Sequence, residues 1–251
     1  MFRFKNLSKF KEIDHFISDR TGGISPAPYD SLNIGFNTKD APKNILRNRK
    51  ILSEMTGIKI SSLTTAKQPH SSNVYIVSQF QKGKGGKDYE SAISDSDALI
   101  TQYPDILLLV QVADCVPLLI FDSKKKVIAA VHAGWKGTML KITEKTLNKM
   151  REEFGSNPKD IIAGIGPSIG PCCYEVGNEV IDKAGDMKRF IDKNNKFDLW
   201  KANEFQLTSV GVKRSNIEIS GICTKDNSNK YFSSRASNGI TGRFGAGIML
   251  I

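Results

Sequence analysis

Cys115 and His132 are the first residues in this sequence whose types and spacing suggest chemistry. They lie seventeen positions apart, and each stands at the edge of an apolar run, VPLLIFD or VIAAVHA. Only the lysine-rich turn at 123–126 separates the runs, so pairing of the two as strands would bring the thiol and the imidazole together. Such a pair can bind a metal ion or act as a nucleophile with its base.

A third candidate is His70, which lies in the polar segment KQPHSSNV just before another apolar run. Two imidazoles and a thiolate suit zinc, and three protein ligands leave a fourth position open for water or substrate. Zinc lowers the pKa of a bound water, which then becomes a usable nucleophile. The alternative is structural: Cys115 as a small buried apolar residue and His132 as a hydrogen-bonded core residue, since no C-x-x-C signature supports a metal.

Two further motifs favour structural interpretations. The stretch GIGPSIG at 164–170 departs from the dinucleotide-binding pattern G-x-G-x-x-G, and Pro167 stands where a helix should begin, so it predicts a tight turn. The adjacent Cys172 and Cys173 form a disulfide only with strain. We therefore expect them to pack, or to line a site.

The elements that position these residues alternate along the chain. Apolar runs that are continuous predict strands buried on both faces, and helical spacing of apolar residues predicts helices. A long segment rich in Gly, Pro, Ser and Asn, 19–42, is expected to be irregular. The pattern indicates an α/β (α+β) class with mixed sheets. The expected strands are 74–79, 97–102, 106–113, 116–122, 127–133, 160–165, 216–222 and 244–251, and the expected helices are 42–55, 138–154, 175–184 and 199–211.

Composition limits the class of protein. With 251 residues, 39% of them hydrophobic and 25% charged, the chain is expected to form one compact domain over 1–251. The four cysteines are too few for a disulfide framework and predict reduced thiols. No apolar stretch approaches the ~20 residues of a membrane span, and the first residues lack a signal-peptide core, so we expect a cytoplasmic protein without a membrane partner. The net charge of +10 comes from short lysine clusters in turns, which disfavours nucleic-acid binding.

Six motifs in order carry a resemblance to a known family: KQPHSSNV, ADCVPLLIFD, AAVHAGWKGT, GIGPSIGPCCYEVG, DLWKANEFQL and GICT…YFSSR…TGR. From about residue 15 onwards the chain resembles the YfiH-like family, known as laccase-domain or polyphenol oxidase proteins. The resemblance implies purine nucleoside phosphorylase, adenosine deaminase and S-methyl-5'-thioadenosine phosphorylase activities. The expected partners are purine nucleosides and phosphate, and the expected state is a monomer or weak homodimer.

The resemblance also implies a site and a fold. It implies zinc (Zn²⁺), with copper as the less favoured metal, held by His70, Cys115 and His132. The implied fold is a layered α/β/β/α arrangement, similar to a bacterial toxin deamidase that uses a Cys and His pair. By position, the residues implied to contact nucleoside, phosphate or another anion are Asn33, Arg49, Arg20, Lys136 and Arg235.

The chain departs from the family pattern near its end. In FSSRAS, Ser234 and Ala236 stand where the family has an aromatic residue or histidine and an arginine, while Arg235 and Arg243 remain. At the position of Lys136 the family often has arginine, so this chain has a point charge in place of a planar guanidinium that can bind an anion with two hydrogen bonds. We therefore expect an altered substrate preference or phosphate affinity.

Three chemistries compete at Cys115 and His132. The favoured hypothesis is a zinc enzyme that deaminates adenosine or transfers its ribose to phosphate, with Asp114 as general acid/base or as the partner that orients a histidine. A metal-free hydrolase would use Cys115 as nucleophile and His132 as base. A copper phenol oxidase would need more histidines than the three present. A scaffold or redox-partner protein is the alternative without catalysis.

Overall fold

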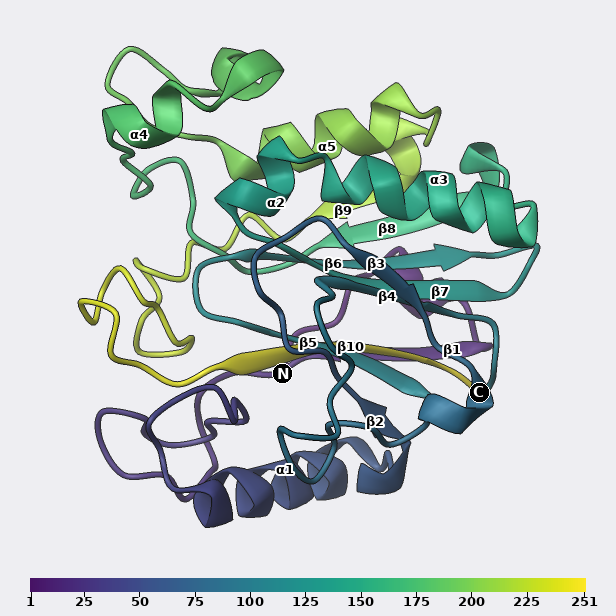
Figure 1. The fold of residues 1–251 in the computed structure, drawn as a ribbon, viewed down its shortest axis with the longest axis vertical. Coiled ribbons are helices and arrows are strands. Elements are labelled where there is room, and N and C mark those ends of the chain that lie inside the picture. The colour runs from purple at the N-terminus through teal and green to yellow at the C-terminus, as the bar shows by residue number, and fades with distance from the viewer.

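Ten strands form two β-sheets that stack face to face in the computed structural model, which describes residues 1–251 (Figure 1). One sheet has four strands in the order β1-β10-β5-β2: β1 is Ile13–Ile17, β10 Phe244–Leu250, β5 Leu107–Val112 and β2 Leu63–Thr64. The other has six strands in the order β3-β4-β7-β6-β8-β9: β3 is Val74–Ile76, β4 Ala98–Thr101, β7 Val127–Ala133, β6 Val116–Asp122, β8 Ile161–Ile165 and β9 Ile217–Ile219. Both sheets combine parallel and antiparallel pairs.

Helices cover the outer face of each sheet. The four-stranded sheet is covered by α1 (Pro42–Thr56), and the six-stranded sheet by α2 (Trp135–Met139), α3 (Ile142–Phe154) and α5 (Leu199–Ser209) (Figure 1). The short α4 (Asn178–Ile181) lies at the periphery. The predicted layered α/β/β/α fold with mixed sheets is thus confirmed. None of these helices has the length and apolar character that spanning a membrane requires.

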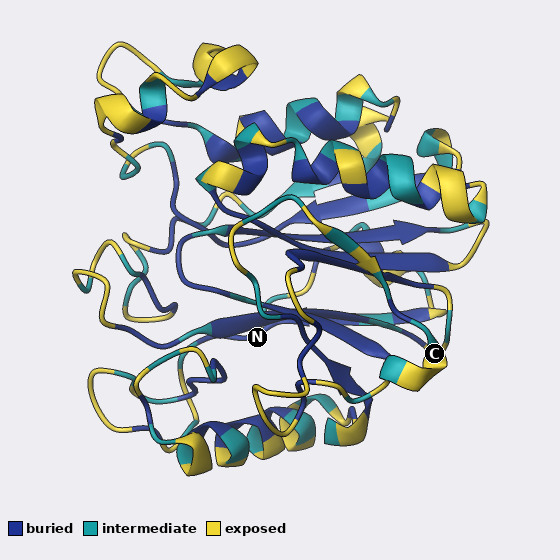
Figure 2. Ribbon diagram, in the orientation of Figure 1, coloured by how far each residue is buried: buried dark blue, intermediate teal, exposed yellow.

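The strand β6 shows why continuous apolar runs form the centre of this fold. All of its residues are buried, because helices cover one face of its sheet and the second sheet covers the other (Figure 2). Side chains alternate between faces, so Leu118 and Ile120 pack in the helix-covered core. Leu119 and Phe121 pack in the core between the sheets.

The predicted pairing of the runs that carry Cys115 and His132 is confirmed. Strands β6 and β7 are antiparallel neighbours, with Val116 opposite Ala133 and Pro117 opposite His132. Cys115 immediately precedes β6, so it reaches the same end of the pair as His132.

The helix prediction for 138–154 was wrong in one respect. The chain forms two helices there, because Lys141 adopts a left-handed backbone with φ of 60°. At the break the carbonyl of Thr138 accepts the backbone N–H of Lys141 at 3.1 Å and Gln206 Nε2 at 2.8 Å. A tertiary contact with α5 therefore replaces the continuation of the helix.

The predicted helix 175–184 is reduced to the four residues of α4. The segment before it pairs instead with a later turn: Val176 N donates to Asn195 O at 2.9 Å, and Glu175 forms a β-bridge with Lys196. Strand β1 was not predicted, because its sequence IDHFI places a charged residue and a histidine inside the run. In both segments, pairing with residues distant in the sequence determines the secondary structure, and no local pattern contains that information.

Candidate metal centre

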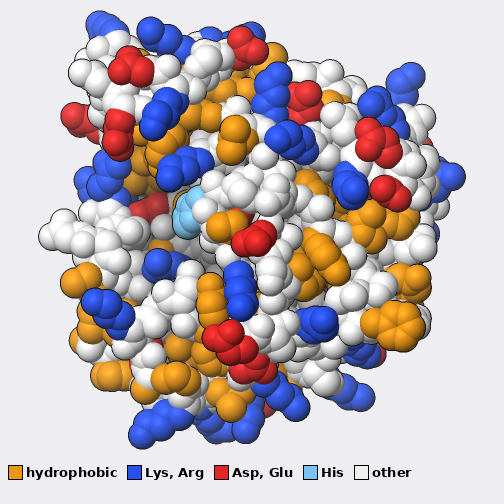
Figure 3. All heavy atoms as spheres, viewed as in Figure 1, with side chains coloured by type: hydrophobic (Ala, Val, Ile, Leu, Met, Phe, Trp, Pro, Cys, Tyr) orange, Lys and Arg blue, Asp and Glu red, His pale blue; other side chains and the backbone are white.

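A cavity of about 430 Å³ lies where the chain passes from β5 in one sheet to β6 in the other. Its size falls in the range of small-molecule sites. Figure 3 shows this face of the molecule hollowed, with a histidine visible in the hollow and basic side chains around it. The lining residues are Asn37, Gln68, His70, Gln111, Val112, Ala113, Asp114, Cys115, His132, Ile169, Tyr174, Ser234, Arg235, Asn238, Gly239 and Arg243.

Two imidazoles and a thiol meet in this cavity. One nitrogen each of His70 and His132 and the sulfur of Cys115 lie within 4.8 Å of one another. The two rings are 4.8 Å apart and nearly perpendicular. Gly134 leaves room for the group, because a Cβ there would lie 3.1 Å from Cys115 Sγ and 3.2 Å from His70 Cδ2. The three side chains that the sequence analysis selected as metal ligands are therefore brought together.

Asp97, which the sequence analysis missed, holds both histidines. Its fully buried carboxylate lies 2.7 Å from Nδ1 of His132, which leaves Nε2 of that ring as the nitrogen available to a ligand. The same carboxylate accepts the backbone N–H of His70 at 3.1 Å. It also accepts the backbone N–H of Ser71 at 2.7 Å and the hydroxyl of Ser71 at 2.8 Å. Carboxylate partners of this kind fix the orientation of metal-binding histidines.

The orienting role considered for Asp114 is therefore wrong, because the structure gives that role to Asp97. Asp114 lines the cavity with a backbone φ of 86°. Its carboxylate accepts the hydroxyl of Thr224 at 2.6 Å and the backbone N–H of Arg235 at 2.7 Å. These bonds join the segment before β6 to two loops near the end of the chain. Its role as general acid/base stays a prediction.

The electrostatics of the site favour an ionised sulfur. Burial raises the pKa of the Cys115 thiol, but the neighbouring His132 and His70 lower it by more, and the net pKa is below its ordinary value. Burial lowers the pKa of His132, whereas Cys115 and Asp97 raise it to a net value above the ordinary one. Both shifts favour the thiolate–imidazolium form of the pair when no cation is bound.

Two arginines and an aromatic ring complete the lining. The guanidinium of Arg235 lies 5.3 Å from the centroid of the Tyr174 ring, and one of its nitrogens donates to Glu175 O at 3.1 Å. One nitrogen of Arg243 donates to the carbonyls of Thr241 and Gly242 at 3.0 and 2.9 Å. The other guanidinium nitrogens of both arginines make no hydrogen bond within the protein, and they can donate to an anion.

Four of the predicted contact residues do not line the cavity. Arg49 is 1% exposed and donates to Ile34 O at 2.8 Å and Gly86 O at 3.1 Å. Asn33 is fully buried, and its side-chain oxygen accepts the backbone N–H of Arg243 at 2.9 Å. Asn33 supports the lining residue Arg243 from behind, whereas the hydrogen bonds of Arg49 reach no lining residue. Contact of either residue with a ligand stays a prediction that this placement does not support.

The remaining two, Arg20 and Lys136, also point elsewhere. Arg20 donates to the carbonyls of Asp30 and Ser228, and Lys136 lies over the Trp135 ring. The sequence analysis missed Gln68, which exchanges two 2.8 Å hydrogen bonds with the backbone of Gln111. Gln68 belongs to the motif KQPH, and its position two residues before the candidate metal ligand His70 could have indicated that it lines the site.

The fold and the site together define a class: an α/β/β/α protein whose cavity combines a His–Cys–His ligand set with two arginines. The chain belongs to the family described as multi-copper polyphenol oxidoreductase laccase, which it matches over residues 14–251.

Relatives and solved structures extend this assignment. The chain is 35% identical to a purine nucleoside phosphorylase of Bacteroides thetaiotaomicron, a match that covers 100% of this chain and 96% of the relative. It is 31% identical to Adenosine deaminase RL5 from an unknown prokaryotic organism, over 88% of this chain and 87% of the relative. The crystal structure of the Bacillus licheniformis hypothetical protein YfiH superposes with a TM-score of 0.90 at 31% identity, over 95% of this chain and 93% of that one.

Proposed function

We propose that this protein is a zinc-dependent enzyme of purine nucleosides. It cleaves adenosine, inosine, guanosine and S-methyl-5'-thioadenosine with phosphate to the free base and the sugar 1-phosphate, and it deaminates adenosine to inosine with water. The observation that carries the proposal is that one cavity is lined by the His–Cys–His ligand set and by two arginines. The names of the relatives support the two reactions. We place the enzyme in the cytoplasm.

The donor atoms fit zinc. Two imidazole nitrogens and one thiolate are ligands that zinc accepts, and three protein ligands on a cavity wall are typical of catalytic sites with an open position. The Asp97–His132 bond and the space left at Gly134 are what such a site requires. When bound, zinc would supply Lewis acidity and lower the pKa of a coordinated water towards neutrality.

In phosphorolysis, the arginines hold the attacking anion. Arg235 and Arg243 have guanidinium nitrogens without partners in the protein, and these can bind the oxygens of phosphate beside the ribose. A phosphate oxygen forms a bond to the anomeric carbon, the carbon–nitrogen bond to the purine breaks, and its electron pair stays with the base. The base then takes a proton, for which Asp114 is the one carboxyl group among the lining residues.

In deamination, water replaces the amino group of adenine, and ammonia leaves with the proton that it gains. This reaction needs no phosphate, so the arginines contribute less to it. The carboxylate of Asp114 can receive and return the proton, while Asp97 keeps the His132 ring fixed.

A second candidate function is a metal-free hydrolase that uses Cys115 as nucleophile. The lowered pKa of this thiol and the raised pKa of His132 favour it, because a thiolate–imidazolium pair is the reactive form of such enzymes. A multi-copper oxidase fits less well than the family description suggests. The chain has three histidines, and His15 is buried with its Nε2 accepting the backbone N–H of Phe4 at 2.9 Å.

The decisive experiment incubates the zinc-loaded protein with adenosine, inosine and S-methyl-5'-thioadenosine, with and without phosphate, and resolves the products by chromatography. Free base that forms only with phosphate demonstrates phosphorolysis, and inosine formed from adenosine without phosphate demonstrates deamination. Conversion that persists after complete removal of metal would support the thiolate hydrolase instead. No conversion of any nucleoside by the zinc-loaded protein would refute the proposal.

Arg243→Gln separates the two reactions. We expect it to raise the KM for phosphate by about 10-fold to 100-fold, because a half-buried charged donor to an anion is lost, and to change deamination less. Arg151→Gln, at an exposed position on α3, is the matched control and should change neither. Equal losses in both reactions would show that Arg243 does not bind phosphate.

A further inference from the structure

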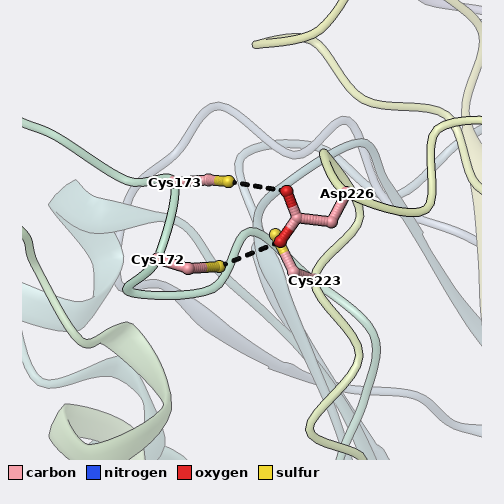
Figure 4. Close-up of side chains that lie close together, drawn as sticks. All are labelled: Cys172, Cys173, Cys223 and Asp226. Carbon is pink, nitrogen blue, oxygen red and sulfur yellow. Dashed lines mark hydrogen bonds between the residues drawn. The ribbon is translucent and has the colours of Figure 1, made fainter.

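A second group of metal-binding side chains lies outside the His–Cys–His site. The thiols of Cys172, Cys173 and Cys223 and the carboxylate of Asp226 have their donor atoms within 4.8 Å of one another. Figure 4 shows the two adjacent cysteines pointing the same way, towards Asp226, with Cys223 completing the group from the other loop. We name these four residues the loop cluster.

The contacts within the loop cluster all run between donor atoms. Cys172 Sγ lies 3.2 Å from one carboxylate oxygen of Asp226, and Cys173 Sγ lies 3.0 Å from the other. Cys223 Sγ accepts the backbone N–H of Gly170 at 3.3 Å, and N–H groups commonly support a ligating sulfur in this way. Tetrahedral ligands at a zinc–sulfur distance of ~2.3 Å are separated by about 3.8 Å, which lies within the 4.8 Å that encloses these four donor atoms.

Two turns of the backbone bring these residues together from distant parts of the chain. The first follows β8, and in it Cys173 N donates to Gly170 O at 3.0 Å. The second holds Cys223, whose carbonyl accepts the backbone N–H of Asn227 at 3.0 Å. A β-bridge between Ser168 and Cys223 joins the two turns. The backbone thus positions the donors before any ion binds.

We propose that the loop cluster is a structural zinc site. Three thiolates select a soft or borderline cation, the carboxylate oxygen suits zinc among these, and four protein ligands close the coordination sphere. Cys223 is 5% exposed, whereas Cys172 and Asp226 are exposed, so an ion can enter from solvent.

The position of the loop cluster gives the ion a function in the molecule. Tyr174, directly after Cys173, lines the central cavity under Arg235. Thr224, directly after Cys223, donates to the carboxylate of Asp114 in the same cavity. An ion at the loop cluster therefore ties together two loops that form one wall of the cavity. Because it contacts no lining side chain itself, its role is positional.

The test is the zinc content of the full chain, purified under reducing conditions and measured by mass spectrometry. We expect two equivalents in the unaltered protein, one in Cys115→Ala, one in Cys172→Ser and none in the double variant. Asp226→Asn, also at an exposed position, repeats the test without altering a thiol. Glu179→Gln, on the exposed surface of α4, is the control and should keep two equivalents.

Cobalt substitution identifies the ligands. Thiolate-to-cobalt absorption reports every sulfur bound, and the two sites hold four thiolates, so Cys115→Ala should lose about a quarter of it. Cys172→Ser should lose the larger share and lower the Tm, with nucleoside conversion reduced but present. A single equivalent that Cys115→Ala removes and Cys172→Ser leaves would overturn the proposal. This result would not bear on the proposed nucleoside reactions, which are measured separately.

Discussion

The two thiol-containing groups of this molecule differ in how they are built. Cys115 and His132 lie at the end of the buried β6–β7 pair and His70 on a loop beside them, and these three side chains leave one side open to a cavity. The loop cluster lies on two surface turns and has four donors of its own. Because ligand number and setting distinguish catalytic from structural zinc sites, the comparison supports the catalytic role proposed for the first group and the structural role proposed for the second.

Their electrostatics differ in the same sense. The neighbouring His132 and His70 lower the pKa of Cys115, which favours the thiolate before a metal binds. In the loop cluster, burial and the hydrogen bond to Asp226 raise the pKa of Cys173 to about 11. The protonated thiols of the loop cluster must lose protons to bind a cation, whereas the lowered pKa of Cys115 favours a sulfur that has already lost its proton.

The largest expected effect follows from Cys115→Ala. The variant should lose the metal of the central site and more than about 100-fold in kcat/KM, since removal of a ligand costs more than removal of its hydrogen-bond partner. Metal content and nucleoside turnover, measured on the same sample, test this. Cys172→Ser is the matched control, and it should keep the central metal. Full turnover in Cys115→Ala would remove the sulfur from the mechanism.

A smaller effect is expected from Asp97→Asn. Loss of the charged partner of His132 should weaken zinc affinity by about 10-fold to 100-fold, because the ring is no longer held with Nε2 towards the ligand position. Competition with a chelator of known affinity measures the change. Ser71→Ala, which removes one hydroxyl bond to the same carboxylate, should change the affinity little. Equal zinc affinities of Asp97→Asn and the unaltered protein would show that the charge of Asp97 is not needed to orient the His132 ring.

Lower pH should release zinc from the two sites with different steepness. In Cys115→Ala, where only the loop cluster binds, the logarithm of the affinity should fall by about three per pH unit, because three thiol protons are displaced. In Cys172→Ser, where only the central site binds, it should fall by about one, for the proton of the His132 imidazolium. A fluorescent zinc indicator, read across the neutral range, measures both slopes. Identical pH slopes of zinc affinity in the two variants would contradict the proposed difference in the number of protons that each site releases.

His15, the third histidine, belongs to neither group of metal-binding side chains and shows how burial changes the pKa of an imidazole. Burial lowers the pKa of His15 to about 4 in the folded protein, against an ordinary value of 6.5. Above pH 6.5 the contribution of the neutral ring to stability is fully present. As the pH falls towards 4, the imidazole is protonated in the unfolded chain but stays neutral in the folded protein. The free energy of unfolding should therefore decrease by up to about 3 kcal/mol across this window.

His15→Gln removes this contribution while keeping an acceptor for the backbone N–H of Phe4. Urea unfolding of both proteins from pH 7 to pH 4 gives the difference between them. That difference should shrink or reverse as the pH falls, because only the unaltered protein carries the titrating ring. A difference that stays constant with pH would show that His15 titrates alike in both states.

The parts of the fold that the sequence predicted are those with local patterns. β6 and β7 are continuous apolar runs because both of their faces are buried, and α1 begins at Pro42 and ends before Gly57, whose φ of 74° closes it. Their pairing across a short turn was enough to bring Cys115 and His132 together. For His70, the type of residue and the family resemblance supplied what spacing could not.

The missed features depend on contacts between distant segments. Asp97 lies 35 residues before His132, and the sequence analysis placed it only as the first residue of the expected strand 97–102. Cys223 meets Cys172 and Cys173 only after two loops have been placed. Lys141 interrupts a helix whose apolar spacing continues across it, because Thr138 bonds to α5. None of these facts is encoded within one window of sequence.

The order of strands in the smaller sheet has a consequence for how the protein is made. β10, which is synthesised last of the strands, lies between β1 and β5 and pairs with both. During synthesis, the edges of β1 and β5 that pair with β10 stay unpaired until residues 244–250 leave the ribosome, and unpaired strand edges promote aggregation. Arg243, which directly precedes β10, reaches the cavity at the same moment. Nascent chains that stall before this strand are therefore expected to be bound by chaperones and to be unable to bind an anion at Arg243.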